Sequence, residues 1–164
     1  MSTMLSTTSQ YALRALSHLA AQSGEAVLGR DLAESVEIPA NYLSKVLLTL
    51  RHAGLVATSR GSGGGYRLAR PADQIHLIDV VELFEEISRS KPSCFLGRTR
   101  ACSETTPCSA HSSWQSLQVT FLEFLVSTPL SAIAGERDEV WTSSGQKPGL
   151  RPQPEQSTQS GGQQ

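Results

Sequence analysis

One stretch decides the fold: residues 39–70 read PANYLSKVLLTLRHAGLVATSRGSGGGYRLAR. Its first half predicts a helix that begins at Pro39, because a proline costs no hydrogen bond in a first helical turn, and that ends at Gly54. Apolar residues recur there at the spacing of one helix face, at Leu43, Val46, Leu47 and Leu50. The second half predicts two short strands, 55–60 and 66–70, joined by the glycine-rich turn 61–65. The stretch therefore predicts a helix followed by a β-hairpin.

Further helices are predicted on both sides of this stretch. Residues 9–22 and 29–36 show apolar residues at helical spacing, with Thr8 and Ser9 as capping residues and Val27-Leu28 as a short strand between the helices. Downstream, residues 77–87 predict an amphipathic helix, 109–126 a longer one and 130–134 a last turn. The predicted fold class is mainly α with a small β-hairpin wing. This is a winged helix-turn-helix domain followed by a long dimerisation helix.

The charge of the chain is informative only locally. The formal net charge is −1, so the whole molecule shows no bias toward a nucleic-acid partner. The stretch 39–70, however, contains no acidic residue and five cations: Lys45, Arg51, Arg60, Arg67 and Arg70. Such a local excess favours contact with phosphate. No apolar run approaches the roughly 18 residues that cross a bilayer, and the first residues lack a signal-peptide pattern, so we expect a cytoplasmic protein.

The helix 39–54 has the features of a recognition helix. In a helix-turn-helix, this helix buries one face on the scaffold and presents the other to the major groove of DNA. Polar side chains gather at the start of its exposed face: Asn41, Tyr42, Ser44 and Lys45. Their donors and acceptors suit base edges or phosphate oxygens. The alternative is an ordinary solvated helix surface.

The glycine-rich turn predicts a wing that approaches double-stranded DNA. Arg60 lies at its base, where an arginine can enter a minor groove. Ser62, Gly63 and Gly64 form the tip, where glycine lets the backbone come close to the sugar–phosphate chain. A nucleotide-binding loop is excluded, because a strand rather than a helix follows the glycines and no Gly-Lys-Ser/Thr is present.

All three cysteines of the chain, Cys94, Cys102 and Cys108, lie within 18 residues that end at His111. Clustered thiols in a chain without a secretory signal indicate metal ligands more than a disulfide framework. Thiolates and imidazole are the donors that iron–sulfur clusters and zinc prefer. His111 could instead cap the following helix or face solvent. A redox switch made only of thiols also stays open.

The helix 109–126 predicts a homodimer. Trp114, Leu117, Phe121 and Phe124 alternate steps of three and four residues, the pattern of a coiled-coil seam. The last 22 residues, 143–164, include six Gln, four Gly, four Ser and three Pro. Such a composition buries too little apolar surface to fold, so this tail is predicted to be disordered.

Residues 5–134 resemble a known family. The pattern LV at 55–56, RGSGGGY at 60–66, IDVV at 78–81 and then three cysteines resembles the IscR/NsrR/RirA family of bacterial winged-helix regulators that hold an iron–sulfur cluster. The resemblance implies that Cys94, Cys102 and Cys108 ligate the cluster and that His111 stands where the IscR type has its histidine ligand. In NsrR-type proteins the fourth ligand can be an aspartate of the first helix, but Gln10 stands there. The first cysteine gap is longer than in the IscR type, so both 2Fe–2S and 4Fe–4S remain open.

These patterns predict a dimeric DNA-binding transcriptional regulator, a repressor, whose operator binding responds to iron, nitric oxide or redox state through the cluster. The predicted parts are a DNA-binding domain (1–90), a cluster-binding loop (91–108), a dimerisation helix with its C-terminal turn (109–142) and the tail (143–164). The alternatives are the same regulator with a thiol-redox or zinc sensor, and a protein-interaction module without DNA binding. No catalytic constellation is found, so no enzyme is expected.

Overall fold

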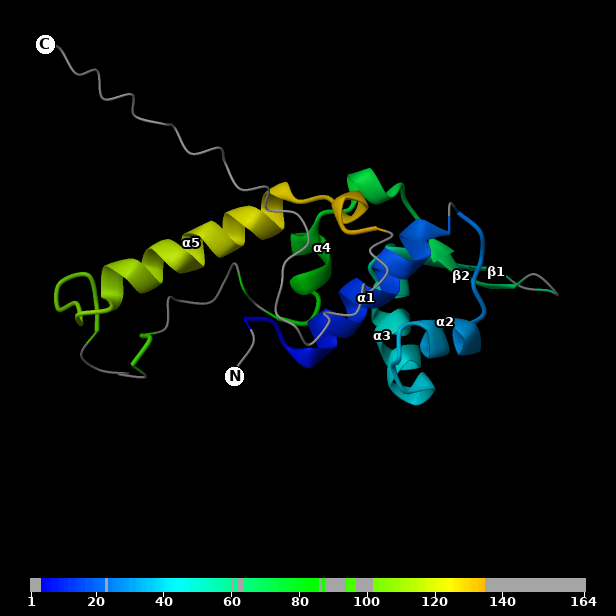
Figure 1. Ribbon diagram of the computed structural model, residues 1–164, viewed down its shortest axis with the longest axis horizontal. Helices are drawn as coiled ribbons and strands as arrows, with labels where there is room; N and C mark the ends of the chain where they lie inside the picture. The colour runs from blue at the N-terminus through cyan, green and yellow to red at the C-terminus, as the bar shows by residue number, and fades with distance from the viewer. Residues whose placement is uncertain are drawn as a thin grey trace, which may run out of the picture.

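The computed structural model describes residues 4–22, 24–59, 61, 64–85, 87, 94–96 and 102–134, and the predicted tail 143–164 lies outside these ranges. Most helices and the hairpin gather into one body, which we call the head (residues 4–85), and helix α5 (His111–Ser127) projects from it (Figure 1). No helix within these ranges combines the length and the hydropathy needed to span a bilayer.

Helix α1 (Thr7–Ala21) begins two residues before the predicted start at residue 9. Its cap is Ser6, whose side chain accepts a hydrogen bond from the Ser9 backbone N–H at 3.2 Å. The prediction that Thr8 and Ser9 cap this helix is therefore wrong. Both lie inside the helix, and Ser9 is fully buried. A serine outside the helix supplies the acceptor that the first free N–H groups require.

The helix-turn-helix consists of α2 (Gly29–Ser35) and α3 (Ala40–His52), which pack against each other as predicted. Pro39 is the residue that precedes α3, and Gly54 follows it with φ of +70°, a conformation that suits glycine. The predicted apolar face of α3 is buried: Leu43, Val46, Leu47 and Leu50. This confirms the periodicity argument for the helix.

The wing is an antiparallel pair of strands, β1 (Val56–Ser59) and β2 (Gly65–Leu68), in the register Val56 opposite Leu68. The predicted strand at Val27-Leu28 is reduced to one bridge, in which Val27 and Tyr66 exchange backbone hydrogen bonds of 2.9 and 2.8 Å. Gly64 is buried in the turn, and a Cβ there would lie 2.7 Å from the Ser59 carbonyl oxygen. Glycine is therefore required at this position by the fold itself.

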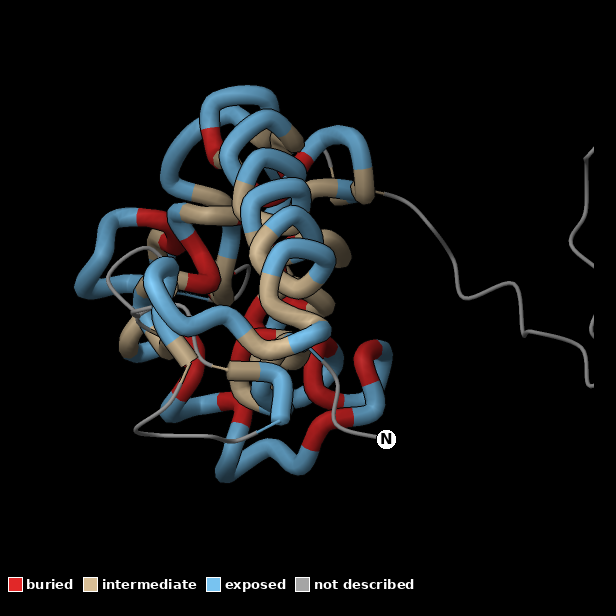
Figure 2. Tube along the Cα trace, turned by 90° about the vertical axis from the view of Figure 1, so that its left-hand side faces the viewer, coloured by how far each residue is buried: buried red, intermediate tan, exposed pale blue. Residues whose placement is uncertain are grey.

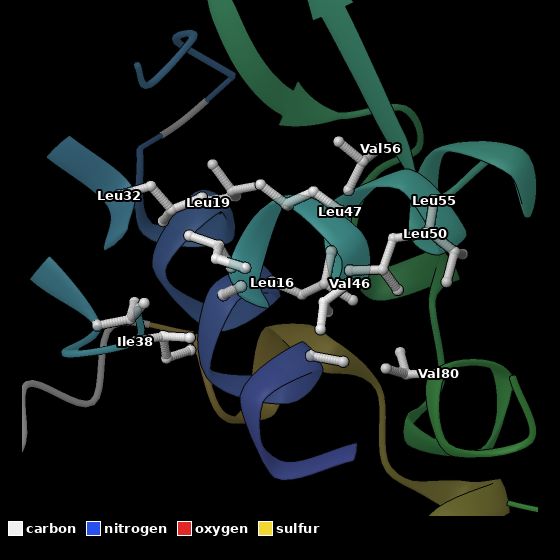
Figure 3. Packing of buried hydrophobic residues seen from close by; sticks show 14 of the residues in the cluster. Leu16, Leu19, Leu32, Ile38, Val46, Leu47, Leu50, Leu55, Val56 and Val80 are labelled. Carbon is white, nitrogen blue, oxygen red and sulfur yellow. The ribbon is translucent and has the colours of Figure 1, made fainter. Parts of the chain in front are cut away.

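One hydrophobic core joins α1, α2, α3, β1 and, through Val80, helix α4 (Leu77–Val81) (Figure 3). Leu16 and Leu19 of α1 meet Leu47 and Leu50 of α3 there, all essentially without exposed surface. Helix α3 is thus fixed to α1 by apolar packing on one side, and much of its other side is exposed.

Helix α4 (Leu77–Val81) follows a short 3₁₀ turn, η1 (Ala72–Gln74), and is much shorter than the predicted helix 77–87. The chain continues as turns in which the Leu83 and Glu85 N–H groups donate to Val80 and Val81 carbonyls. The Glu85 carboxylate accepts hydrogen bonds from the Ser6 backbone N–H at 2.8 Å and from the Ser9 hydroxyl. This segment therefore ends at the start of α1, a contact that favours turns over a continued helix.

Helix α5 (His111–Ser127) is held on the head by its C-terminal half only. Its buried residue, Leu125, packs with Leu77 and Val81 of α4, and Phe121 borders the same cluster. The following turn, η2 (Leu130–Ala132), returns to the main core through Leu130. Most of the α5 surface is exposed or only half-buried (Figure 2).

Candidate metal centre and nucleic-acid interface

The three cysteine sulfurs converge beside His111, the first residue of α5. This end of α5 points away from the head (Figure 1). Their Sγ atoms all lie within 4.8 Å of one another, and those of Cys94 and Cys108 are 3.8 Å apart. Each of the three side chains is half-buried. Two separate segments supply them, 94–96 and the turns that lead into α5.

This arrangement fits a metal by its donor set and by its spacing. Two thiolates bound to one tetrahedral zinc ion at about 2.3 Å lie about 3.8 Å apart, which is the separation of the Cys94 and Cys108 sulfurs. Three thiols that face one point also suit iron, since thiolates hold iron–sulfur clusters. The residues present therefore fit either group.

His111, the first residue of α5, touches this group from one side. Its Nδ1 lies 3.1 Å from Cys102 Sγ, and its backbone N–H donates to the Cys108 carbonyl at 3.0 Å. The imidazole thus lies beside the sulfurs through Cys102, and its ligand role stays a prediction. Gln10, at the position of the alternative ligand, donates its side-chain amide to the Leu5 carbonyl at 3.0 Å.

The surroundings of Cys102 disfavour a bare thiolate at that position. A backbone hydrogen bond at Cys108 lowers the pKa of the Cys102 thiol, but burial and the neighbouring thiols of Cys108 and Cys94 raise it by more. The net pKa of Cys102 is therefore above its usual value, because a thiolate there would be poorly solvated and repelled by its neighbours. A metal ion would offset both costs and release protons on binding.

An aromatic contact fixes the first cysteine segment on α5. The rings of Phe95 and Trp114 are 5.4 Å apart at an angle of 52°. Trp114 was predicted to lie in a dimer seam together with Leu117, Phe121 and Phe124. Leu117 and Phe124 are about half exposed, whereas Phe121 packs partly on its own head. The seam stays a prediction, with Leu117 and Phe124 as the members that face outward.

The start of α3 presents the predicted DNA-contacting side chains to solvent. Asn41, Ser44 and Lys45 are exposed, and the Ser44 hydroxyl donates to the Ala40 carbonyl at 2.7 Å. Of the wing residues predicted to touch DNA, Gly64 is described, whereas Arg60, Ser62 and Gly63 lie outside the described residues. Their DNA contacts stay predictions.

Tyr42 is connected to α1 in a way that periodicity could not reveal. Its hydroxyl shares a hydrogen bond of 2.6 Å with Thr8 Oγ1, and its ring meets Tyr11 edge-on at 5.5 Å. The contact joins residues 34 positions apart, so nothing in the local sequence indicates it. Tyr42 therefore links α3 to α1, and its contact with DNA stays a prediction.

Comparison with known proteins gives a consistent picture. A family model described as Rrf2, iron-dependent transcriptional regulator, matches residues 5–136. An HTH-type transcriptional regulator of Neisseria meningitidis serogroup A is 33% identical over 136 residues, which are 82% of this chain and 89% of that protein.

Two solved structures resemble the fold over most of the chain. The global cysteine regulator CymR of B. subtilis has a TM-score of 0.67 and 26% identity, covering 84% of this chain and all of CymR. IscR of T. potens has a TM-score of 0.60 and 28% identity, covering 80% of this chain and 85% of that one. Both the winged-helix head and the long helix therefore have counterparts in solved regulators.

Proposed function

The chain belongs to the Rrf2 family of HTH-type transcriptional regulators, and from this premise we propose a homodimeric repressor that binds operator DNA and responds to an iron–sulfur cluster. The observation that carries the proposal is the convergence of three cysteine sulfurs within 4.8 Å beside α5. The protein would act in the cytoplasm, where its DNA is, and no catalysis is expected of it.

The DNA partner is supported by the exposed start of α3 and by the charge around it. Lys45, Arg51, Arg67 and Arg70 are exposed, and described acidic residues are absent between Pro39 and Arg70. Asn41 and Ser44 can pair with base edges, while the cations neutralise phosphate. The test is binding of a duplex selected from a random-sequence pool, repeated as salt is raised. The logarithm of the affinity should fall linearly with the logarithm of salt, and flat or absent binding would favour a protein partner instead.

The Tyr42–Thr8 hydrogen bond yields a prediction about the recognition helix. Tyr42→Phe and Thr8→Val each remove one partner of that bond, which is worth about 0.5–1.5 kcal/mol, so each should weaken operator binding by up to about tenfold. The double variant should be no weaker than either single one. Titrations of all four proteins against the selected duplex measure this coupling.

The double variant separates support from direct contact. If Tyr42 acts only by positioning α3 through Thr8, the double variant loses no more affinity than either single variant. Additive losses would show that the Tyr42 hydroxyl acts on DNA independently of Thr8.

The dimer is supported by the apolar surface of α5. Leu117 is 48% exposed and Phe124 49%, and they lie seven residues apart on one side of the helix. Such apolar side chains at heptad spacing suit a second copy of the same helix. We place the symmetric contact of the dimer there.

Glutamate substitutions test this surface. The double variant Leu117→Glu, Phe124→Glu should be monomeric at micromolar concentration, because two charges per chain would be buried unpaired in the interface. Ser116→Glu, which adds the same charge at the adjacent exposed position, should remain dimeric. Light scattering after size exclusion measures both masses, and a dimeric double variant would refute the assignment.

The signal is proposed to pass through contacts that begin beside the cysteines. A cluster bound there would supply a centre that reacts with oxygen and nitric oxide and whose assembly depends on iron. In the chain, Cys94 comes after the head and Cys108 comes before α5. A cluster bound by both cysteines would therefore fix α5 relative to the head. The segment before Cys94 contains Glu85, which accepts hydrogen bonds from the cap residue Ser6 and from Ser9 of α1. Helix α1 in turn contacts Tyr42 through Thr8. Two arrangements of this chain of contacts would give two operator affinities.

A thiol sensor is the second candidate. It is supported by the likeness to CymR, described as a global cysteine regulator, and by the presence of three half-buried cysteine thiols. A zinc site with the same ligands is equally compatible with the sulfur spacing. Zinc and thiols are colourless, so the absorption spectrum of the purified protein distinguishes both from a cluster.

A further inference from the structure

We propose that Cys94 and Cys108 are joined in a disulfide when hydrogen peroxide meets the metal-free protein, while Cys102 remains a thiol. The inference rests on the proposed function only in treating the three cysteines as a sensor. It adds which two sulfurs react and what their reaction does to metal binding.

The pairing follows from the different surroundings of the three sulfurs. The Sγ atoms of Cys94 and Cys108 face each other at 3.8 Å, whereas Cys102 Sγ is engaged by His111 Nδ1 at 3.1 Å. Joining Cys102 to either neighbour would require breaking this contact with the first residue of α5. A Cys94–Cys108 disulfide leaves the Cys102–His111 contact in place, and it requires the two sulfurs to approach from 3.8 Å to a bonded distance of about 2.0 Å.

The aromatic contact of the neighbouring residue keeps the reacting pair together. Phe95 directly follows Cys94, and its ring lies 5.4 Å from that of Trp114 in the first turns of α5. Cys108 is tied to the same helix start, because its carbonyl accepts the His111 backbone N–H. Both sulfurs are therefore held at one end of α5 without a metal.

The reaction balances with peroxide as the oxidant. The thiolate of one cysteine attacks a peroxide oxygen and becomes a sulfenic acid, while the released hydroxide takes up the thiol proton and leaves as water. The sulfur of the other cysteine then attacks the sulfenic sulfur, forming the disulfide and releasing a second water. The two thiols lose two electrons and two protons, and the peroxide is reduced to two water molecules.

The disulfide and the metal exclude each other. Oxidation consumes two of the three thiolates, and the remaining thiol with His111 is a much poorer metal site. Conversely, a bound metal occupies the electron pairs with which the sulfurs would attack peroxide. The oxidised chain would also keep segment 94–96 linked to the start of α5, so oxidation would not simply reproduce the loss of the metal.

The test is a disulfide map of the full-length protein. Chelator-treated, reduced protein receives one equivalent of hydrogen peroxide, free thiols are alkylated, and the chain is cut with trypsin and a glutamate-specific protease. These cuts place each cysteine in its own peptide: 90–98, 101–104 and 105–123. We expect a linked pair of 90–98 with 105–123 and an alkylated 101–104. A pair that contains 101–104, or sulfinic acid without a disulfide, would overturn the assignment.

Matched variants sharpen the result. Cys102→Ser should form the same disulfide, whereas Cys94→Ser should form none within the chain. Phe95→Ala should slow formation severalfold, while Leu96→Ala, at the next exposed apolar position, should not. Equal rates in the two alanine variants would refute the role of the ring contact. The metal content of the reduced wild-type chain is measured in parallel, so a failure of the metal site is visible separately from a failure of the disulfide.

Discussion

Cys108→Ser is expected to lose the metal site almost completely. Cys108 supplies a sulfur that faces both other cysteines and a carbonyl that accepts the first N–H of α5. Loss of even an outer partner of a metal ligand costs about 10–100-fold in affinity, so loss of a thiolate donor should exceed that range. Iron, sulfide and zinc per chain, measured after anaerobic purification, should fall to background.

The control is the neighbouring residue. Ser109→Ala changes an exposed side chain next to Cys108 and removes no soft donor, so it should bind metal like the wild type. Both variants should have wild-type circular dichroism, since the head core contains no residue of this segment. Full metal content in Cys108→Ser would mean that Cys94, Cys102 and other groups suffice, and the three-cysteine site would be wrong.

Leu50→Ala is expected to lower the free energy of unfolding by about 2–5 kcal/mol, the range for buried leucines that leave a cavity. Leu50 lies on the inner face of α3, and its side chain is fully buried in the core. Because this packing also holds the recognition helix in place, operator binding should weaken at temperatures where the variant is still folded. Urea unfolding followed by circular dichroism measures the stability.

Leu48 offers a comparison on the same helix. It lies two residues away on the outer face and is 48% exposed. Leu48→Ala should change the free energy of unfolding by about 0.5 kcal/mol or less, as surface substitutions do. Equal losses in the two variants would contradict the assignment of the inner and outer faces of α3.

Periodicity and turn chemistry were sufficient to predict α3 and the wing. The apolar spacing of Leu43, Val46, Leu47 and Leu50 identified the buried face of α3, and the glycines located the turn between β1 and β2. These signals are local, because each depends on residues a few positions apart. They also led to the resemblance that the family match confirms.

The errors of the sequence-based prediction have long-range causes. The helix predicted at 77–87 ends at Val81. The Glu85 carboxylate instead accepts hydrogen bonds from Ser6 and Ser9, which lie 79 and 76 positions earlier in the chain. Thr8 was predicted to be a cap, yet it bonds Tyr42 on α3. Helical spacing carries no information on such contacts.

The candidate site was predictable in composition but not in arrangement. The spacing of three cysteines indicated a metal, whereas their mutual approach, the His111–Cys102 contact and the Phe95–Trp114 contact required coordinates. These contacts distinguish one cysteine from the other two, which sequence alone presents as equivalent. That difference underlies the proposed pairing of Cys94 with Cys108.

The most direct test of a cluster-dependent regulator is anaerobic purification of the full-length protein, followed by absorption and EPR spectra with iron and acid-labile sulfide counts. A brown protein with about two or about four iron atoms and matching sulfide per chain is the result predicted here, and its reduced-state EPR signal would distinguish 2Fe–2S from 4Fe–4S. A colourless protein that also resists cluster reconstitution would contradict the cluster, and would leave zinc or the thiols themselves as the sensor.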